Sequence, residues 1–276
     1  MLAHVNGTEL YYEVVGEGRP LMLMHGGLGL DHTYFRPWLD PLAEHYQLIF
    51  YDHSGNGRSP RPQGFDGVSH ATWADEADAL RAHLGHDRMI LLGQSYGGII
   101  AQEYALRHGD RLDGLILLCT APALDYPDVV VANARRRGTP EQVTAAVEGL
   151  ARPADSDDDF RQLWNTILPL YFKRFDPAIA AATDRRTHYS AGAFNHSFGV
   201  CLPTYNVVDR LPEIATPTLV LAGRDDWITP PEQAERIHAA LPSSELVIFE
   251  ESGHFPFVEE QQTFLTTVEE WLARLP

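Results

Sequence analysis

The sequence predicts an α/β fold in which helices cover both faces of a mostly parallel sheet. Three observations predict it. Short apolar runs alternate with helical stretches up to about residue 120 and again after residue 210. The stretch between them, residues 121–210, contains no convincing strand. A serine between glycines, Ser95, stands where one apolar run gives way to a helix.

The first half of the chain supplies most of the alternation. The Asn6-Gly7 turn precedes the first expected strand. Apolar residues at helical spacing, among them Ala77, Leu80 and Leu84, predict a helix before the serine. We expect strands at residues 8–15, 20–24, 47–51, 89–92 and 114–119, and helices at residues 34–45, 71–84 and 99–106.

The second half begins with helices only. Thr139-Pro140-Glu141-Gln142 is typical of a helix start, with Thr as cap and Pro in the first turn, and Thr229-Pro230-Pro231-Glu232 repeats it. Helices are expected at residues 157–172, 177–186, 189–200, 231–240 and 256–275, and strands at 218–222 and 245–249. The chain therefore divides into a core domain, residues 1–120 and 211–276, and a helical cap, residues 121–210.

The segment Gly93-Gln94-Ser95-Tyr96-Gly97-Gly98 carries the strongest chemical signal. It follows the apolar run 89–92 and precedes a helix. A serine in such a tight strand-to-helix turn is typical of a nucleophile elbow, which holds the hydroxyl above the sheet edge. The flanking glycines leave room for the neighbouring strand and helix. We therefore predict that Ser95 is a nucleophile.

A serine hydroxyl needs a base, usually a histidine that a carboxylate orients. His254 follows the last expected strand, and Gly253 permits a tight loop there. Asp226 follows the preceding strand, which gives the chain order Ser, Asp, His. The neighbouring Asp225 is the alternative acid, and Asp125, early in the cap, is a third candidate.

Stabilising the oxyanion of an acyl-transfer reaction requires two backbone N–H groups. One is expected from Tyr96, directly after the nucleophile. The other is expected from the loop His25-Gly26-Gly27-Leu28-Gly29, with Gly27 preferred and Leu28 as the alternative.

The cap is rich in aromatic residues, and most of them are expected to pack the cap on itself. Pockets at such a seam are usually apolar. We expect Leu28, Trp227, Trp164, Phe172 and Phe198 to line a substrate pocket. The run Arg135-Arg136-Arg137 is expected to be a solvated helix end.

Together these segments resemble the α/β-hydrolase superfamily, and most closely proline iminopeptidases and related esterases. The resemblance implies an eight-stranded sheet with the cap inserted after strand 6, and a serine hydrolase acting on an ester or amide. Leu28 stands where iminopeptidases typically have proline, and Trp227 where some have a substrate-binding glutamate. A lactonase remains an alternative, as does a ligand-binding receptor on the same scaffold. The resemblance rests on His25-Gly26-Gly27-x-Gly29, Asp52-x-x-Gly55-x-Gly57-x-Ser59, Gly93-x-Ser95-x-Gly97-Gly98, Gly223-x-x-Asp226 and Gly253-His254.

The amino-acid composition limits the classes of molecule that this protein can be expected to bind. A formal net charge of -17 argues against nucleic acid, because phosphate binding needs a basic surface. No run is long enough to span a membrane, and the N-terminus has no signal-peptide pattern. Two cysteines imply a reducing compartment, so we expect a cytoplasmic protein. A small-molecule substrate is the expected partner, without metal or cofactor; the oligomeric state stays open.

Overall fold

The computed structural model describes all 276 residues. Its eight strands form one sheet in the order β1-β2-β4-β3-β5-β6-β7-β8. The pairs β1–β2 and β2–β4 are antiparallel, and every other neighbouring pair is parallel, which confirms the predicted sheet. The strands are β1 (Leu2–Val5), β2 (Thr8–Val15), β3 (Arg19–Met24), β4 (Tyr46–Tyr51), β5 (Met89–Gln94), β6 (Leu112–Leu118), β7 (Thr218–Gly223) and β8 (Ser244–Phe249).

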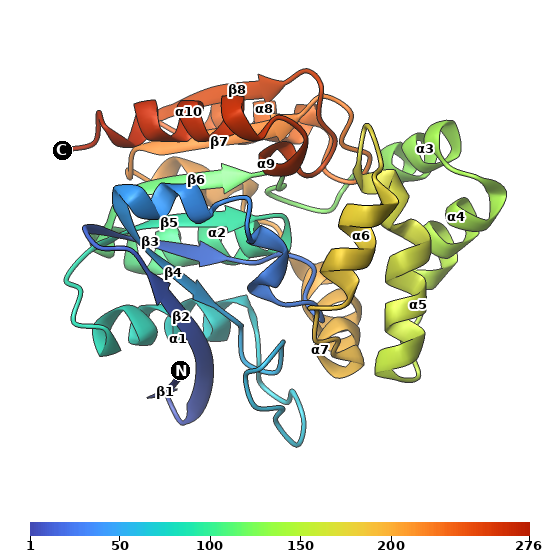
Figure 1. The fold of residues 1–276 in the computed structure, drawn as a ribbon, viewed down its shortest axis with the longest axis horizontal. Helices are drawn as coiled ribbons and strands as arrows, with labels where there is room; N and C mark the ends of the chain where they lie inside the picture. The colour runs from blue at the N-terminus through green and yellow to red at the C-terminus, as the bar shows by residue number, and fades with distance from the viewer.

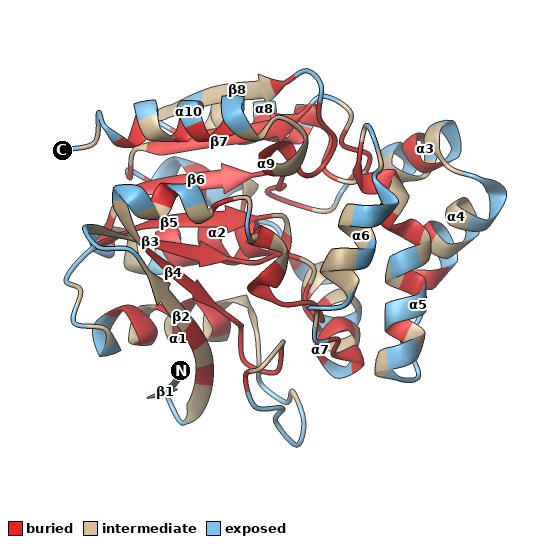
Figure 2. Ribbon diagram, viewed as in Figure 1, coloured by how far each residue is buried: buried red, intermediate tan, exposed pale blue.

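Helices cover both faces of this sheet because side chains alternate between the faces along each strand. In β6, Leu115 and Leu117 pack with helices α1 (His70–His83), α2 (Tyr96–His108) and α8 (Pro231–Ala240). Ile116 and Leu118 pack on the opposite face with α10 (Gln261–Leu272). The strands between the two layers are buried along most of their length (Figure 2).

Every element between β6 and β7 is helical or part of the loops, except for one isolated bridge. Of these, α3 to α7 gather beyond the carboxyl ends of the parallel strands (Figure 1). The division into core and cap at residues 121 and 210 stays a prediction. The helices are α3 (Pro127–Arg137), α4 (Pro140–Thr144), η4 (Ala145–Gly149), α5 (Asp157–Ile167), η5 (Leu168–Tyr171), α6 (Pro177–Asp184), α7 (Ala191–His196), η6 (Ser197–Cys201), η7 (Leu202–Thr204) and η8 (Val208–Glu213).

Two of the expected helical segments are present, and local hydrogen bonds explain the start of the first. The Thr139 hydroxyl accepts the N–H of Gln142, and the Gln142 side chain reaches back to Thr139, as the predicted helix start requires. The final helical stretch is present but divided into α9 (Pro256–Glu259) and α10. None of the helices is both long and apolar enough to cross a lipid bilayer.

Two expectations need correction, and one strand was not expected. The helix expected at residues 34–45 is two short 3-10 turns, η1 (His32–Phe35) and η2 (Asp40–Glu44), because Pro37 forces Arg36 into an extended conformation. Thr229 does not cap α8, whose N-cap is Pro230. The edge strand β1 was not predicted; it is short and is completed by pairing with β2. The remaining turn is η3 (Gly109–Arg111).

Candidate active site

Ser95 sits at the corner between β5 and α2 in a strained conformation, with φ 55° and ψ -120°. A non-glycine residue with positive φ is uncommon and persists only where the surrounding structure enforces it. The close packing at Gly97 shows the enforcement, since a Cβ there would overlap the carbonyl oxygen of Met24. The helix N-terminus beneath Ser95 favours negative charge.

His254 and Asp226 are brought together from the loops after β8 and β7. His254 Nδ1 lies 2.6 Å from Asp226 Oδ2, and both side chains are buried. Asp226 Oδ1 accepts the backbone N–H groups of Ile228 and Thr229, each at 3.0 Å. The carboxylate is thus held by its own loop, and it orients the imidazole.

His254 and Ser95 face the same cavity. Because Asp226 engages Nδ1, the other ring nitrogen, Nε2, remains for the serine. No hydrogen bond joins the Ser95 hydroxyl to the imidazole in this structure; such bonds are often long in enzymes without substrate and tighten when it binds.

The two other candidate acids point elsewhere. Asp225 pairs with Arg137 and Lys173, each at 3.2 Å. Asp125 is exposed and pairs with Arg236 at 2.8 Å. Of the three, the structure brings only Asp226 to His254.

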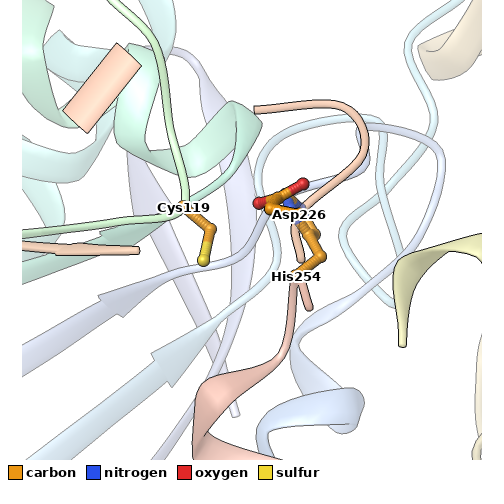
Figure 3. A group of neighbouring side chains, drawn as sticks. All are labelled: Cys119, Asp226 and His254. Atoms are coloured by element: carbon orange, nitrogen blue, oxygen red, sulfur yellow. The ribbon is translucent and has the colours of Figure 1, made fainter. Parts of the chain in front are cut away.

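A buried thiol completes the surroundings of this pair. Cys119, Asp226 and His254 have potential ligand atoms within 4.8 Å of one another (Figure 3). Burial raises the pKa of the Cys119 thiol well above its usual value, and the charge of Asp226 raises it further. Metals bind the thiolate. In this structure Asp226 and His254 Nδ1 are already engaged with each other, so the group consists of a His–Asp hydrogen bond beside a buried thiol.

Thr229 belongs to the same group, and sequence reasoning assigned it wrongly. Its hydroxyl lies 2.8 Å from Asp226 Oδ2 and 2.9 Å from the carbonyl oxygen of Cys119, so it can donate to one of them at a time. The threonine-proline pattern could not reveal this role, because Cys119 lies on a distant strand end.

The glycine-rich loop after β3 lies directly against the serine. A Cβ at Gly26 would stand 2.6 Å from the Ser95 Cβ. Gly27, Leu28 and Tyr96 all border the cavity. Tyr96 is the first residue of α2, so its N–H has no acceptor inside the helix. The predicted oxyanion donors, with Leu28 as the alternative to Gly27, therefore line the same cavity as Ser95.

A hydrogen-bonded chain that the sequence did not signal links this loop to the histidine. Tyr34 Oη accepts the N–H of Gly26 at 2.6 Å and donates to Gln94 Oε1 at 2.7 Å. Gln94 Nε2 donates to the carbonyl oxygen of His254 at 3.4 Å. Burial raises the pKa of Tyr34, which keeps the phenol protonated. No spacing pattern marks Tyr34, because it lies in η1, a 3-10 turn of only four residues.

The cavity over Ser95 is mostly apolar, and no carboxylate, ammonium or guanidinium group lines it. Of its 32 lining residues 23 are hydrophobic, and none is Asp, Glu, Lys or Arg. The volume of the cavity, including the solvent-filled space at its opening, is about 1150 Å³. The cap contributes aromatic rings from α5, η5, α7 and η6. A small or medium substrate with an apolar part fits such a space.

Four of the five expected pocket residues border the cavity: Leu28, Trp164, Phe172 and Phe198. The expectation for Trp227 is wrong. Its ring is fully buried outside the lining and meets Tyr171 edge to face at 5.4 Å. Trp227 packs against Tyr171 of the cap, while the side chain of Asp226 points to His254.

Comparison with known proteins agrees with this geometry. Residues 19–261 match the family model of the alpha/beta hydrolase fold. A proline iminopeptidase of Clostridium botulinum is 31% identical over 95% of this chain and 94% of its own. An esterase from Exiguobacterium antarcticum superimposes with a TM-score of 0.80 at 25% identity, covering 99% of this chain and 98% of its own. An enol-lactonase from Burkholderia xenovorans gives a TM-score of 0.80 at 25% identity, covering 99% and 100%.

Proposed function

This chain belongs to the α/β-hydrolase fold family, and from that premise we propose that it hydrolyses carboxylic esters of small, uncharged, partly apolar substrates. Lactones, as cyclic esters, fall within the same chemistry. Ser95, His254 and Asp226 act as nucleophile, base and orienting acid.

In the proposed reaction Ser95 Oγ attacks the carbonyl carbon while His254 Nε2 takes the hydroxyl proton. The N–H groups of Gly27 and Tyr96 hold the oxyanion that forms. The leaving alkoxide takes the proton from His254, which leaves an acyl group on Ser95. Water then repeats the sequence and releases the acid. Asp226 stabilises the imidazolium at each step.

The observation that carries the ester assignment is that no Asp, Glu, Lys or Arg lines the cavity. An aminopeptidase must hold a free ammonium group beside the scissile bond, and a buried cation needs a carboxylate partner. None of the residues that line the cavity is acidic. The iminopeptidase relative keeps peptidase activity as the second candidate, and substrate charge separates the two.

A paired assay should separate them in kcat/KM. We expect p-nitrophenyl butyrate to exceed prolyl p-nitroanilide by about 100-fold or more, because an unpaired buried cation costs roughly 3 kcal/mol. N-acetylprolyl p-nitroanilide, which lacks the cation, is the matched control for amide reactivity. Comparable rates for the butyrate ester and the free prolyl anilide would contradict the assignment.

Tyr34→Phe should lower kcat about tenfold with little change in KM. The variant removes the acceptor of the Gly26 N–H and the donor to Gln94, which loosens the loop next to Ser95. Binding of a boronic acid, which mimics the tetrahedral intermediate, should weaken with kcat. Tyr46→Phe is the control, since Tyr46 lies in β4 and is not among the residues that line the cavity. Unchanged boronate affinity would remove Tyr34 from the oxyanion support.

A further inference from the structure

We propose that Arg137 and Asp225 are positioning residues whose ion pair fixes a cap segment, residues 171–173, against the backbone of His254. The proposal rests on the hydrolytic function assigned to His254. It gives separate tasks to the two adjacent aspartates. Asp226 orients the imidazole ring, and Asp225 anchors the chain that holds the histidine backbone.

The first step is the contact between the cap and the histidine loop. The backbone N–H of His254 donates to the carbonyl oxygen of Tyr171 at 2.6 Å. Gly253 permits this approach, since a Cβ there would stand 2.5 Å from that oxygen and 3.1 Å from the Lys173 nitrogen. The Tyr171 ring also meets the imidazole edge to face, with centroids 5.1 Å apart. The position of His254 therefore depends on where the cap places Tyr171.

The second step is what holds that cap segment. Arg137 ends α3, and its Nη2 donates to the carbonyl oxygen of Phe172 at 2.7 Å. Its Nη1 donates to Asp225 Oδ1 at 3.2 Å. One guanidinium therefore connects the loop that carries the triad acid to the residue next to Tyr171. The expectation of a solvated helix end is wrong for Arg137 but agrees with the exposure of Arg135 and Arg136.

Lys173 completes the arrangement from the other side. Its Nζ lies 3.2 Å from Asp225 Oδ2 and donates to the carbonyl oxygen of Glu250 at 2.8 Å. Each carboxylate oxygen of Asp225 is thus paired with a cation of the cap. The N–H of Asp225 also donates to the carbonyl oxygen of Ser252, so its loop is tied to the histidine loop.

The exposure of the pair indicates a geometric task more than a large contribution to stability. The Arg137 side chain is 17% exposed and that of Asp225 32%, and partly exposed ion pairs contribute little to folding. Geometry is what a triad requires, because a shift of about 1 Å can cost 100-fold in rate. A planar, forked guanidinium can span two acceptors in fixed positions, which a lysine ammonium cannot do in the same way.

Kinetics of single and double variants test the proposal. We expect Arg137→Met and Asp225→Asn each to lower kcat for p-nitrophenyl butyrate by about 10- to 100-fold, with KM changed less than about threefold. The kcat of the double variant should be no lower than that of the less active single variant, because both changes break the same Arg137–Asp225 connection. Arg137→Lys should recover only part of the loss. Arg136→Met, on the same helix and exposed, is the matched control and should match the wild type.

Proton NMR supplies a readout that does not depend on turnover. The proton between His254 Nδ1 and Asp226 should give a downfield signal that shifts or broadens in Arg137→Met and stays unchanged in Arg136→Met. An Arg137→Met protein with wild-type kcat and an unchanged signal would overturn the proposal, whatever its melting temperature. A wild type that neither cleaves esters nor reacts with a fluorophosphonate would instead overturn the proposed function, while the NMR comparison would still test the positioning role.

Discussion

Replacing Ser95 with alanine is expected to lower the turnover of ester hydrolysis about a million-fold, because the acyl-enzyme route loses its nucleophile. The backbone at this position already holds a non-glycine residue at φ 55°, so alanine adds no new steric conflict and the fold should be retained. Steady-state rates with p-nitrophenyl butyrate, together with a thermal melt of both proteins, measure the effect.

Covalent labelling provides the control for the same prediction. Intact-mass spectrometry after treatment with a fluorophosphonate should show one adduct on the wild type and none on Ser95→Ala. Ser243→Ala, a change at an exposed serine, should label as the wild type does. An adduct on Ser95→Ala would identify a different nucleophile. A wild type without any adduct would favour the alternative of a ligand-binding protein on this scaffold.

Replacing Asp226 with asparagine is expected to lower kcat on the order of ten thousand-fold through the wrong histidine tautomer. Asp226 Oδ1 accepts two backbone N–H groups, of Ile228 and Thr229, so the amide oxygen of asparagine should occupy that place. The amide NH2 then faces His254 Nδ1, which can only accept. The ring proton moves to Nε2, and that nitrogen can no longer take the proton of Ser95.

Two measurements test the Asp226→Asn prediction: the pH dependence of its rate, and the activity of a control variant at Asp125. Hydroxide can replace the lost base, so the rate of Asp226→Asn should recover part of its loss as pH rises. Asp125→Asn is the matched control, because Asp125 is exposed and pairs only with Arg236. A variant at position 226 that loses less than about tenfold would show that another group orients the imidazole.

Local patterns explain how much of the site could be predicted. A strained turn between a buried strand and a helix requires glycine neighbours, so a short sequence motif predicts the elbow around Ser95. The chain order Ser, Asp, His follows from the order of the strands. The capped start of α4 at Thr139 is equally local, since its hydrogen bonds span three residues.

Neighbours distant along the chain decided the rest. Thr229 fits a cap pattern, yet its hydroxyl contacts Asp226 and the carbonyl oxygen of Cys119, which follows β6. Trp227 stands beside the candidate acid in the sequence, but packing against Tyr171 removes it from the cavity. In the sequence Arg137 does not differ from its exposed neighbours, and only the folded structure shows its ion pair with Asp225.

The alternation of strands and helices, the elbow at Ser95 and the few acids and histidines that could assist it can all be predicted from the sequence. These depend on backbone turns and on the period of apolar residues, which short segments encode. The folded chain was needed to show which of the two adjacent aspartates meets His254, which aromatic rings border the cavity and that no Asp, Glu, Lys or Arg lines it. Those outcomes depend on side-chain directions and on contacts between segments far apart in the chain, and no local pattern records them.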